Sequence, residues 1–166
     1  MATPTNLPAA QTTGNVLTAA YVNDLRGAFR ILQVVSASTS TLVSNSTTTL
    51  ADTNLTATIT PQSNTSKILV LVSQSFSKSS GNASNAVISV IKRDTTTVST
   101  FQGAALYTGT TVDFVGPAAS AVLLDSPATT SATTYKTQFN NFTSAASVSA
   151  NPNSALATIT LFEVSA

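Results

Sequence analysis

The sequence has no Cys, no His and no Trp, and only 8% of its 166 residues are charged. Without His and Cys, the Ser-His-Asp and Cys-His nucleophile systems, thiolate chemistry and the usual zinc ligands are excluded. Six carboxylates remain, and no D-x-D-x-D-G calcium loop contains them. We therefore expect no enzyme active site and no bound metal or cofactor.

Charge is scarce in both signs, since seven basic and six acidic side chains leave a net charge of +1. So small a balance creates no long-range field that would attract nucleic acid or an anionic membrane. The longest apolar run, ILVLV at 68–72, is far shorter than the ~20 residues of a membrane helix. The N-terminus has no basic cluster followed by an apolar run, so no export signal is expected. These features predict no nucleic-acid partner and no membrane insertion.

Hydroxyl side chains dominate the composition: 30 Thr and 23 Ser make up 53 of the 166 residues. Disordered chains combine low hydrophobicity with high net charge, whereas 42% of these residues are hydrophobic. A chain of this length can bury roughly 70% of its unfolded surface. We therefore expect a folded domain with a sizeable core.

The first thirty residues lack any strand pattern. Residues 1–16 contain Pro4, Pro8 and Gly14 and no apolar periodicity, which predicts an extended N-terminal arm. Residues 17–30 predict a short helix with Thr18 as its N-cap. Apolar side chains recur there at helical spacing and form one stripe, Val22, Leu25, Phe29 and Leu32. A helix this short is marginal alone, so the stripe must pack against the β domain or against a partner.

From Ile31 onward, short segments rich in Val, Ile, Thr and Phe alternate with Ser, Asn, Gly and Pro, which is typical of strands. No helical pattern lies between them, which disfavours a βαβ fold. We predict an all-β domain over residues 31–166, a β-sandwich of jelly-roll-like type. The predicted strands are Ile31–Ala37, Leu55–Thr60, Lys67–Ser77, Ala86–Lys92, Val98–Phe101, Val112–Val115, Ser120–Asp125, Thr134–Phe142 and Ala155–Val164.

Alternation of side chains indicates which strands are half-buried. In the segment NLTATIT, Leu55, Ala57 and Ile59 share one face while three Thr share the other. The segments ILVLV and TITLF are apolar on both faces and must be covered twice, by a helix, another layer or another subunit. The expected core consists of Ile59, Ile68, Val70, Val72, Ile88, Val90, Leu123, Phe139, Ile159 and Leu161.

Oligomerisation is the cover we favour for the doubly apolar strands. Monomeric β proteins protect their sheet edges with Lys and other charges, and this chain has only four Lys. We expect a homotrimer whose interfaces cover the second face of strands such as Lys67–Ser77. Because the N-terminal third differs so clearly from the rest, the arm and helix are the expected attachment or oligomer interface. The residues assigned to that interface are Leu7, Leu17, Val22, Leu25, Phe29 and Leu32.

Four segments resemble a known family in their order along the chain. They read LTAAYVNDLRGAFRILQVV, ITPQSNTSKILVLVS, LDSPATTSATTYKTQF and ITLFEVSA. Together they are similar to tailed-bacteriophage virion structural proteins of the head fibre, tail fibre or capsid decoration type. The resemblance covers about residues 17–166 and implies a non-enzymatic, trimeric β domain displayed on a phage particle and assembled in the bacterial cytoplasm.

Two particle positions are compatible with that resemblance. A chain without a shaft or collagen-like repeat fits a head fibre, spike or capsid decoration protein held on another virion protein by its N-terminal arm. The alternative is a tail-fibre tip that recognises a bacterial surface glycan, for which stacked aromatic rings would be needed. Five aromatic residues are available for stacking, although core or interface packing is their favoured use: Tyr107, Phe114, Tyr135, Phe139 and Phe142.

Overall fold

The computed structural model describes residue 18 and residues 31–165, and in the latter range it contains twelve β-strands and one 3-10 turn. The predicted arm and helix lie outside these residues, apart from Thr18. The strands are β1 Ile31–Thr39, β2 Val43–Asn45, β3 Ala51–Ile59, β4 Lys67–Gln74, β5 Phe76–Lys78, β6 Val87–Arg93, β7 Thr96–Ala105, β8 Phe114–Val115, β9 Ala119–Asp125, β10 Thr133–Asn141, β11 Val148–Ala150 and β12 Ala157–Val164. The 3-10 turn covers Pro152–Ser154.

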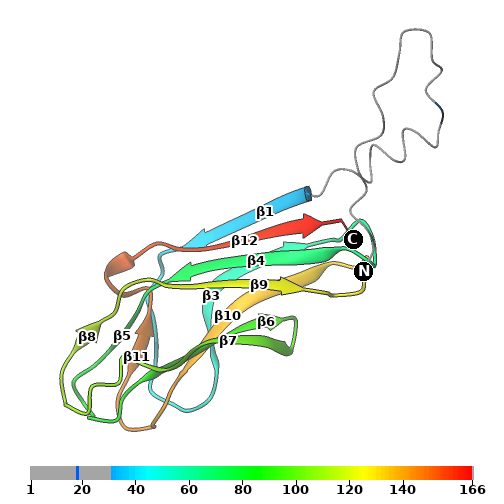
Figure 1. Ribbon diagram of the computed structural model, residues 1–166. Coiled ribbons are helices and arrows are strands. Elements are labelled where there is room, and N and C mark those ends of the chain that lie inside the picture. Colours follow the sequence, from blue (N-terminus) through cyan, green and yellow to red (C-terminus); the bar gives the residue numbers. More distant parts are fainter. Residues whose placement is uncertain (1–17, 19–30, 166) are drawn as a thin grey trace.

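The strands form two layers in which every pair is antiparallel (Figure 1). One layer contains the sheet β1-β12-β4-β9, which we call the first sheet, and the other contains β3-β10-β6-β7, the second sheet. A small distal sheet has the order β2-β11-β5-β8. Each of its strands precedes or follows the corresponding strand of the first sheet along the chain, so the distal sheet continues the first sheet beyond a break.

The strand order is that of a jelly roll. If strands on either side of the break are counted as one, eight strands remain, and their orders are 1-8-3-6 in one layer and 2-7-4-5 in the other. Such a double-sheet arrangement of two Greek keys recurs in viral capsid proteins, lectins and cupins. The predicted all-β sandwich is confirmed.

Inward-facing side chains of the two layers form the core between them. The larger cluster includes Leu55, Ile68 and Ile159, and a second cluster lies under the distal sheet around Phe76 and Phe139. Eight of the ten predicted core residues are buried: Ile59, Ile68, Val70, Val72, Val90, Phe139, Ile159 and Leu161.

The prediction was wrong for two residues, Ile88 and Leu123, which are only half-buried. In β6 the register against β7 shifts on both sides of Ser89, so strict alternation fails and Val90 and Ile91 are both buried. Leu123 faces inward and packs on the larger core cluster. It lies on β9, an outer strand with a neighbouring strand on one side only, so part of the side chain stays exposed.

The strand limits also differ from the sequence prediction in particular places. The predicted strand Lys67–Ser77 is divided at Ser75 into β4 and β5, and the short strands β2 and β11 were not predicted. Three-residue strands have too few alternating positions to stand out from the Ser-rich and Thr-rich turns around them. The break and both missed strands belong to the distal sheet.

A buried polar network fills the interior where the first sheet breaks. Thr137 on β10 donates a hydrogen bond to Gln74 Oε1 (2.8 Å), and its hydroxyl lies 2.5 Å from that of Thr53. Gln74 Nε2 in turn donates to Asn151 Oδ1 (2.9 Å), and the Asn151 backbone N–H donates to the carbonyl of Ser75 (2.9 Å). All four network side chains are buried. The network therefore satisfies polar groups that interrupted strands leave unpaired.

The outer strands of the two large sheets carry very little charge. They are β1 and β9 in the first sheet and β3 and β7 in the second. Among their 35 residues the only charged side chains are Asp52 and Asp125. Each of these aspartates forms an ion pair with a residue of another strand.

Candidate functional site

The outward face of the first sheet is built from rows of side chains that the strand register places side by side. One row crosses the sheet as Val34, Phe162, Leu69 and Leu124. The next row is Ser36, Thr160, Leu71 and Val122, and the one after it contains only Ser and Thr: Ser38, Thr158, Ser73 and Ser120. We call the six apolar residues of the first two rows the apolar face: Val34, Phe162, Leu69, Leu124, Leu71 and Val122.

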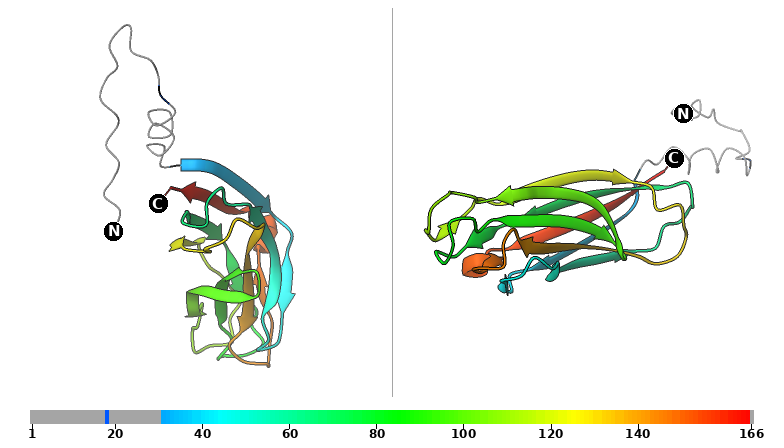
Figure 2. Two further views of the ribbon diagram at one scale, coloured as in Figure 1. Left: turned by 90° about the vertical axis from the view of Figure 1, so that its right-hand side faces the viewer. Right: turned by 90° about the horizontal axis from the view of Figure 1, so that it is seen from below.

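The apolar face is open among the described residues. Val122 is 73% exposed, Leu124 55% and Val34 53%, while Leu69, Leu71 and Phe162 are half-buried. β1 begins and β12 ends at the same end of the first sheet (Figures 1 and 2). The register places the two apolar rows toward this end and the Ser and Thr row farther along. The exposed apolar residues of the first sheet thus lie toward the end where β1 begins.

The outward face of the second sheet has the opposite character. Its side chains include Thr56, Thr58, Thr134, Lys136 and Gln138. The hydroxyls of Thr58 and Thr134 lie 2.9 Å apart across the strands. This face follows the common pattern of an antiparallel sheet with one solvated side. Comparison of the two outer faces indicates that only the first sheet has a face suited to burial.

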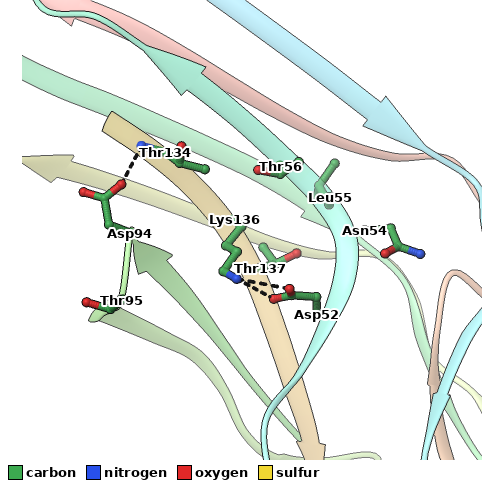
Figure 3. Close-up of a pocket in the computed structure, with 9 residues that line it drawn as sticks. All are labelled: Asp52, Asn54, Leu55, Thr56, Asp94, Thr95, Thr134, Lys136 and Thr137. Atoms are coloured by element: carbon green, nitrogen blue, oxygen red, sulfur yellow. Dashed lines mark hydrogen bonds and ion pairs between the residues drawn. The ribbon is translucent and has the colours of Figure 1, made fainter. Parts of the chain in front are cut away.

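A shallow groove of about 470 Å³ crosses the polar face near a bulge in β3 (Figure 3). Lys136 Nζ lies 2.9 Å from Asp52 Oδ1, and Gln138 Nε2 donates to the same oxygen (2.7 Å). Partial burial opposes ionisation of Asp52, but the hydrogen bonds from Lys136 and Gln138 and the charge of Lys136 hold its pKa below the ordinary value. Across the groove, Asp94 accepts a hydrogen bond from the Thr134 backbone N–H (2.9 Å). The charged groups of the groove are thus paired with one another or with backbone.

A second ion pair joins the two layers. Arg93 on β6 donates to both carboxylate oxygens of Asp125 on β9, at 2.9 and 2.8 Å. The Tyr135 hydroxyl donates to Asp125 Oδ2 (2.7 Å). Burial, together with the hydrogen bond to the Asp125 carboxylate, raises the pKa of Tyr135, so the phenol keeps its proton. These three groups hold the edge of the first sheet against the second sheet.

Glu163 is a buried carboxylate that anchors a loop. Gln33 Nε2 donates to its Oε2 (2.6 Å), and the backbone N–H of Gln62 donates to its Oε1 (2.7 Å). Burial opposes ionisation, but the hydrogen bonds from the Gln33 side chain and from the loop backbone outweigh it and lower the pKa of Glu163. Both carboxylate oxygens are thus committed to structural contacts.

The Glu163 contacts predict acid sensitivity. A carboxyl group whose pKa is lower in the folded than in the unfolded state stabilises the fold fully at pH values above its unfolded pKa, 4.5 for Glu163. This stabilisation is lost as the pH falls from 4.5 through the lowered folded-state pKa. We expect Glu163→Gln to flatten part of this pH dependence. The substitution should also lower the free energy of unfolding by about 1–3 kcal/mol at neutral pH. The new amide NH2 group is a donor, and it must face one of two other donors, Gln33 Nε2 or the Gln62 N–H. Urea unfolding between about pH 3 and pH 7 measures both effects. An unchanged pH profile in the variant would contradict this role.

The residues assigned from sequence to the attachment surface are mostly beyond the part of the chain that the structure describes. These are Leu7, Leu17, Val22, Leu25 and Phe29. Leu32 is described, and its assignment to the helical stripe is wrong. It lies half-buried in β1, because pairing of Ile31 with Val164 already starts the strand.

Sequence reasoning found only part of the apolar face. Leu69, Leu71 and Phe162 were indicated by the two doubly apolar segments, whereas Val34, Val122 and Leu124 were missed. The segments QVVS and AVLLD also contain adjacent apolar residues. Successive side chains of a strand point to opposite faces, so one residue of each adjacent pair must face outward.

Two kinds of feature are absent from residue 18 and residues 31–165. These residues hold no group of three or more carboxylate, His or Cys side chains that could bind a metal ion. Helices long and apolar enough to cross a membrane are also absent from this part of the chain.

The fold and its surfaces together define a jelly-roll β-sandwich with one apolar and one polar outer face. No protein-family model matches the chain, and no curated protein is significantly similar to it. Among solved structures, the chain is similar to the infectious bursal disease virus VP2 subviral particle, with 15% sequence identity, a TM-score of 0.43, and coverage of 82% of this chain and 38% of that chain. The structure of the Gx strain of the same virus gives 13% identity and a TM-score of 0.42, with the same two coverages. The chain thus spans 38% of these viral chains' length.

Proposed function

We propose that this protein is a non-enzymatic structural component of a tailed-bacteriophage virion, displayed on the particle exterior as a head fibre, spike or capsid decoration protein. The observation that carries the proposal is that the first sheet has an apolar outer face and the second sheet a polar one. One face is suited to contact with protein and the other to contact with water. The jelly-roll strand order, which recurs in viral capsid proteins, and the resemblance of the four quoted segments support it.

In this proposal the protein is a homotrimer held on another virion protein by residues 1–16, and it assembles in the host bacterial cytoplasm. The near absence of charge on the outer strands supports association, because exposed edges without charge invite pairing. Several apolar side chains outside the apolar face are also exposed and could contribute to contacts between subunits: Leu42, Val112, Val115 and Leu156.

A second candidate function is recognition of a bacterial surface glycan by a tail-fibre tip. It is favoured by three aromatic side chains in loops and short strands near the distal sheet, where Tyr107 is 58% exposed, Phe142 51% and Phe114 42%. The buried Lys78 holds the loop that carries Tyr107, since its Nζ donates to Thr108 Oγ1 (2.5 Å) and to the Thr110 carbonyl (3.0 Å). Exposed rings on an anchored loop can stack on sugar rings. The other two aromatic residues considered for stacking, Tyr135 and Phe139, are buried in the core.

Quantitative proteomics of purified virions distinguishes the two functions. A decoration protein or head fibre should be present at hundreds of copies per particle, whereas a tail-tip fibre should be present at a few tens or fewer. Electron cryomicroscopy of virions labelled with an antibody to the chain then locates it on the head or the tail. Absence of the protein from purified virions would contradict both assignments.

A further inference from the structure

We propose that a groove over the distal sheet binds an acidic saccharide, and that Lys78 binds the carboxylate or phosphate group of this ligand. The inference rests on the second candidate function and deepens it, because it names the class of glycan and the place where the glycan binds. Three observations carry it: a buried cation without a carboxylate partner, a groove that contains this residue, and the chemistry of the groove walls.

Lys78 on β5 is a buried cation. It is only 2% exposed, and Glu163 is the one other charged residue that is buried in the described part of the chain. No carboxylate of residues 31–165 forms an ion pair with Lys78, since the two ion pairs in this range involve Arg93 and Lys136. Removing an ammonium group from water without an opposite charge beside it is costly. A negative charge on a ligand would offset this cost.

The Lys78 ammonium group keeps a donor for such a ligand. Its Nζ donates to Thr108 Oγ1 (2.5 Å) and to the Thr110 carbonyl (3.0 Å). An ammonium group can donate three hydrogen bonds, so one N–H has no acceptor among the described residues. Both acceptors are neutral, and a neutral amide could hold the loop as well. The positive charge is therefore explained better by an anion that binds than by the loop alone.

A groove of about 290 Å³ lies over the distal sheet, at the end of the sandwich away from the start of β1 (Figure 1). Lys78 is one of the residues that line it. Small-molecule sites range upward from roughly 300 Å³. The groove is close to this lower limit, so it suits a small ligand such as one sugar residue of a longer glycan.

The groove walls combine hydroxyl groups with apolar surface. Ser77 and Ser149 are cross-strand partners whose side chains face away from the core, and both line the groove. Phe114, which is 42% exposed, adds an aromatic ring, and Leu42, which is 56% exposed, adds an aliphatic group. Serine hydroxyls can form hydrogen bonds with sugar hydroxyls, and an aromatic ring can stack on a sugar ring. An inorganic anion would use Lys78 alone, whereas an acidic saccharide would use all of these groups.

Asp113 also lines the groove and gives a second electrostatic test. Its Oδ1 accepts a hydrogen bond from the Ser80 backbone N–H (2.5 Å), and it forms no ion pair with Lys78 in the described part of the chain. This carboxylate repels an acidic ligand. Asp113→Asn should therefore strengthen the binding of an acidic saccharide and leave the binding of a neutral one unchanged.

Chemical-shift titrations of the isotopically labelled full-length protein test the proposal. The probes are methyl glucuronide, its neutral counterpart methyl glucoside, glucose 6-phosphate and inorganic phosphate. The two acidic sugars should shift the backbone amide signals of Ser77, Phe114 and Ser149 and bind about tenfold more tightly than methyl glucoside. Lys78→Gln should abolish this difference, because its amide can donate to both loop oxygens but carries no charge. Lys92→Gln removes a lysine outside the groove and should leave the difference unchanged.

Several outcomes would overturn the proposal: no binding of any probe, equal affinity for acidic and neutral sugars, or acidic binding that survives Lys78→Gln. Inorganic phosphate that binds as tightly as glucose 6-phosphate would also overturn it, since the site would then recognise an anion alone. If Lys78→Gln does not fold, Asp113→Asn decides, and unchanged affinity for methyl glucuronide contradicts the proposal. Binding of methyl glucoside alone would refute the acidic ligand and leave glycan recognition standing, while the copy number on virions tests the proposed function separately.

Discussion

Deleting residues 2–16 is expected to leave a folded trimer that no longer assembles onto virions. The deletion touches no strand, because β1 begins at Ile31. Residues 1–16 have too few apolar groups for a core of their own, so the arm is free to serve attachment. Light scattering should give about three times the mass of the truncated subunit, which is smaller than the 16.9 kDa of the full chain, while proteomics of virions should find the truncated chain depleted.

A pair of point substitutions refines this experiment. Leu7→Asp should reduce incorporation into virions, because Leu7 is an apolar side chain within the arm, whereas Thr5→Asp adds the same charge two residues away and should have little effect. Incorporation of the truncated protein at the wild-type copy number would contradict attachment through the arm. Loss of folding on truncation would also contradict it, since the arm would then be part of the domain.

Phe76→Ala is expected to lower the free energy of unfolding by about 3–5 kcal/mol. Phe76 is only 1% exposed, and its ring centroid lies 6.2 Å from that of Phe101 and 6.0 Å from that of Phe139. It follows directly after the break at Ser75 and joins the distal sheet to the second sheet. Truncation would leave a cavity between two layers whose strands cannot easily collapse inward. Urea unfolding at a fixed subunit concentration measures the loss.

Phe142→Ala is the matched control for this substitution. The same side chain is removed, but Phe142 is 51% exposed, so the free energy of unfolding should change by no more than about 0.5 kcal/mol. A loss below about 1 kcal/mol for Phe76→Ala would contradict the assignment of Phe76 to a well-packed core.

Side-chain alternation made the central part of the fold predictable. In β3, Leu55, Ala57 and Ile59 are buried while the intervening Thr56 and Thr58 are exposed, as the period-2 pattern required. In the doubly apolar segment at Ile68–Val72, Ile68, Val70 and Val72 fill the core and Leu69 and Leu71 face outward. A cover over the outward side chains stays a prediction. A strand of eight or nine residues contains enough positions for this pattern to be clear.

Features that depend on contacts between distant segments could not be predicted. The network of Thr53, Gln74, Thr137 and Asn151 joins residues up to 98 positions apart, and each looks like an ordinary polar residue in sequence. The bulges that bury both Val90 and Ile91 depend on pairing with β7. The full apolar face became visible only when strand register aligned Val34 with Phe162, Leu69 and Leu124.

The nearly uncharged outer strands have a consequence for the life of the protein before assembly. Unpaired strand edges without charge are templates for edge-to-edge aggregation. The only two charges on these edges, Asp52 and Asp125, are already neutralised by Lys136 and Arg93. Within the proposed assembly, newly made chains would face a competition between productive association and precipitation, and the isolated subunit would be the vulnerable form. Rapid capture into that assembly would keep the concentration of free edges low.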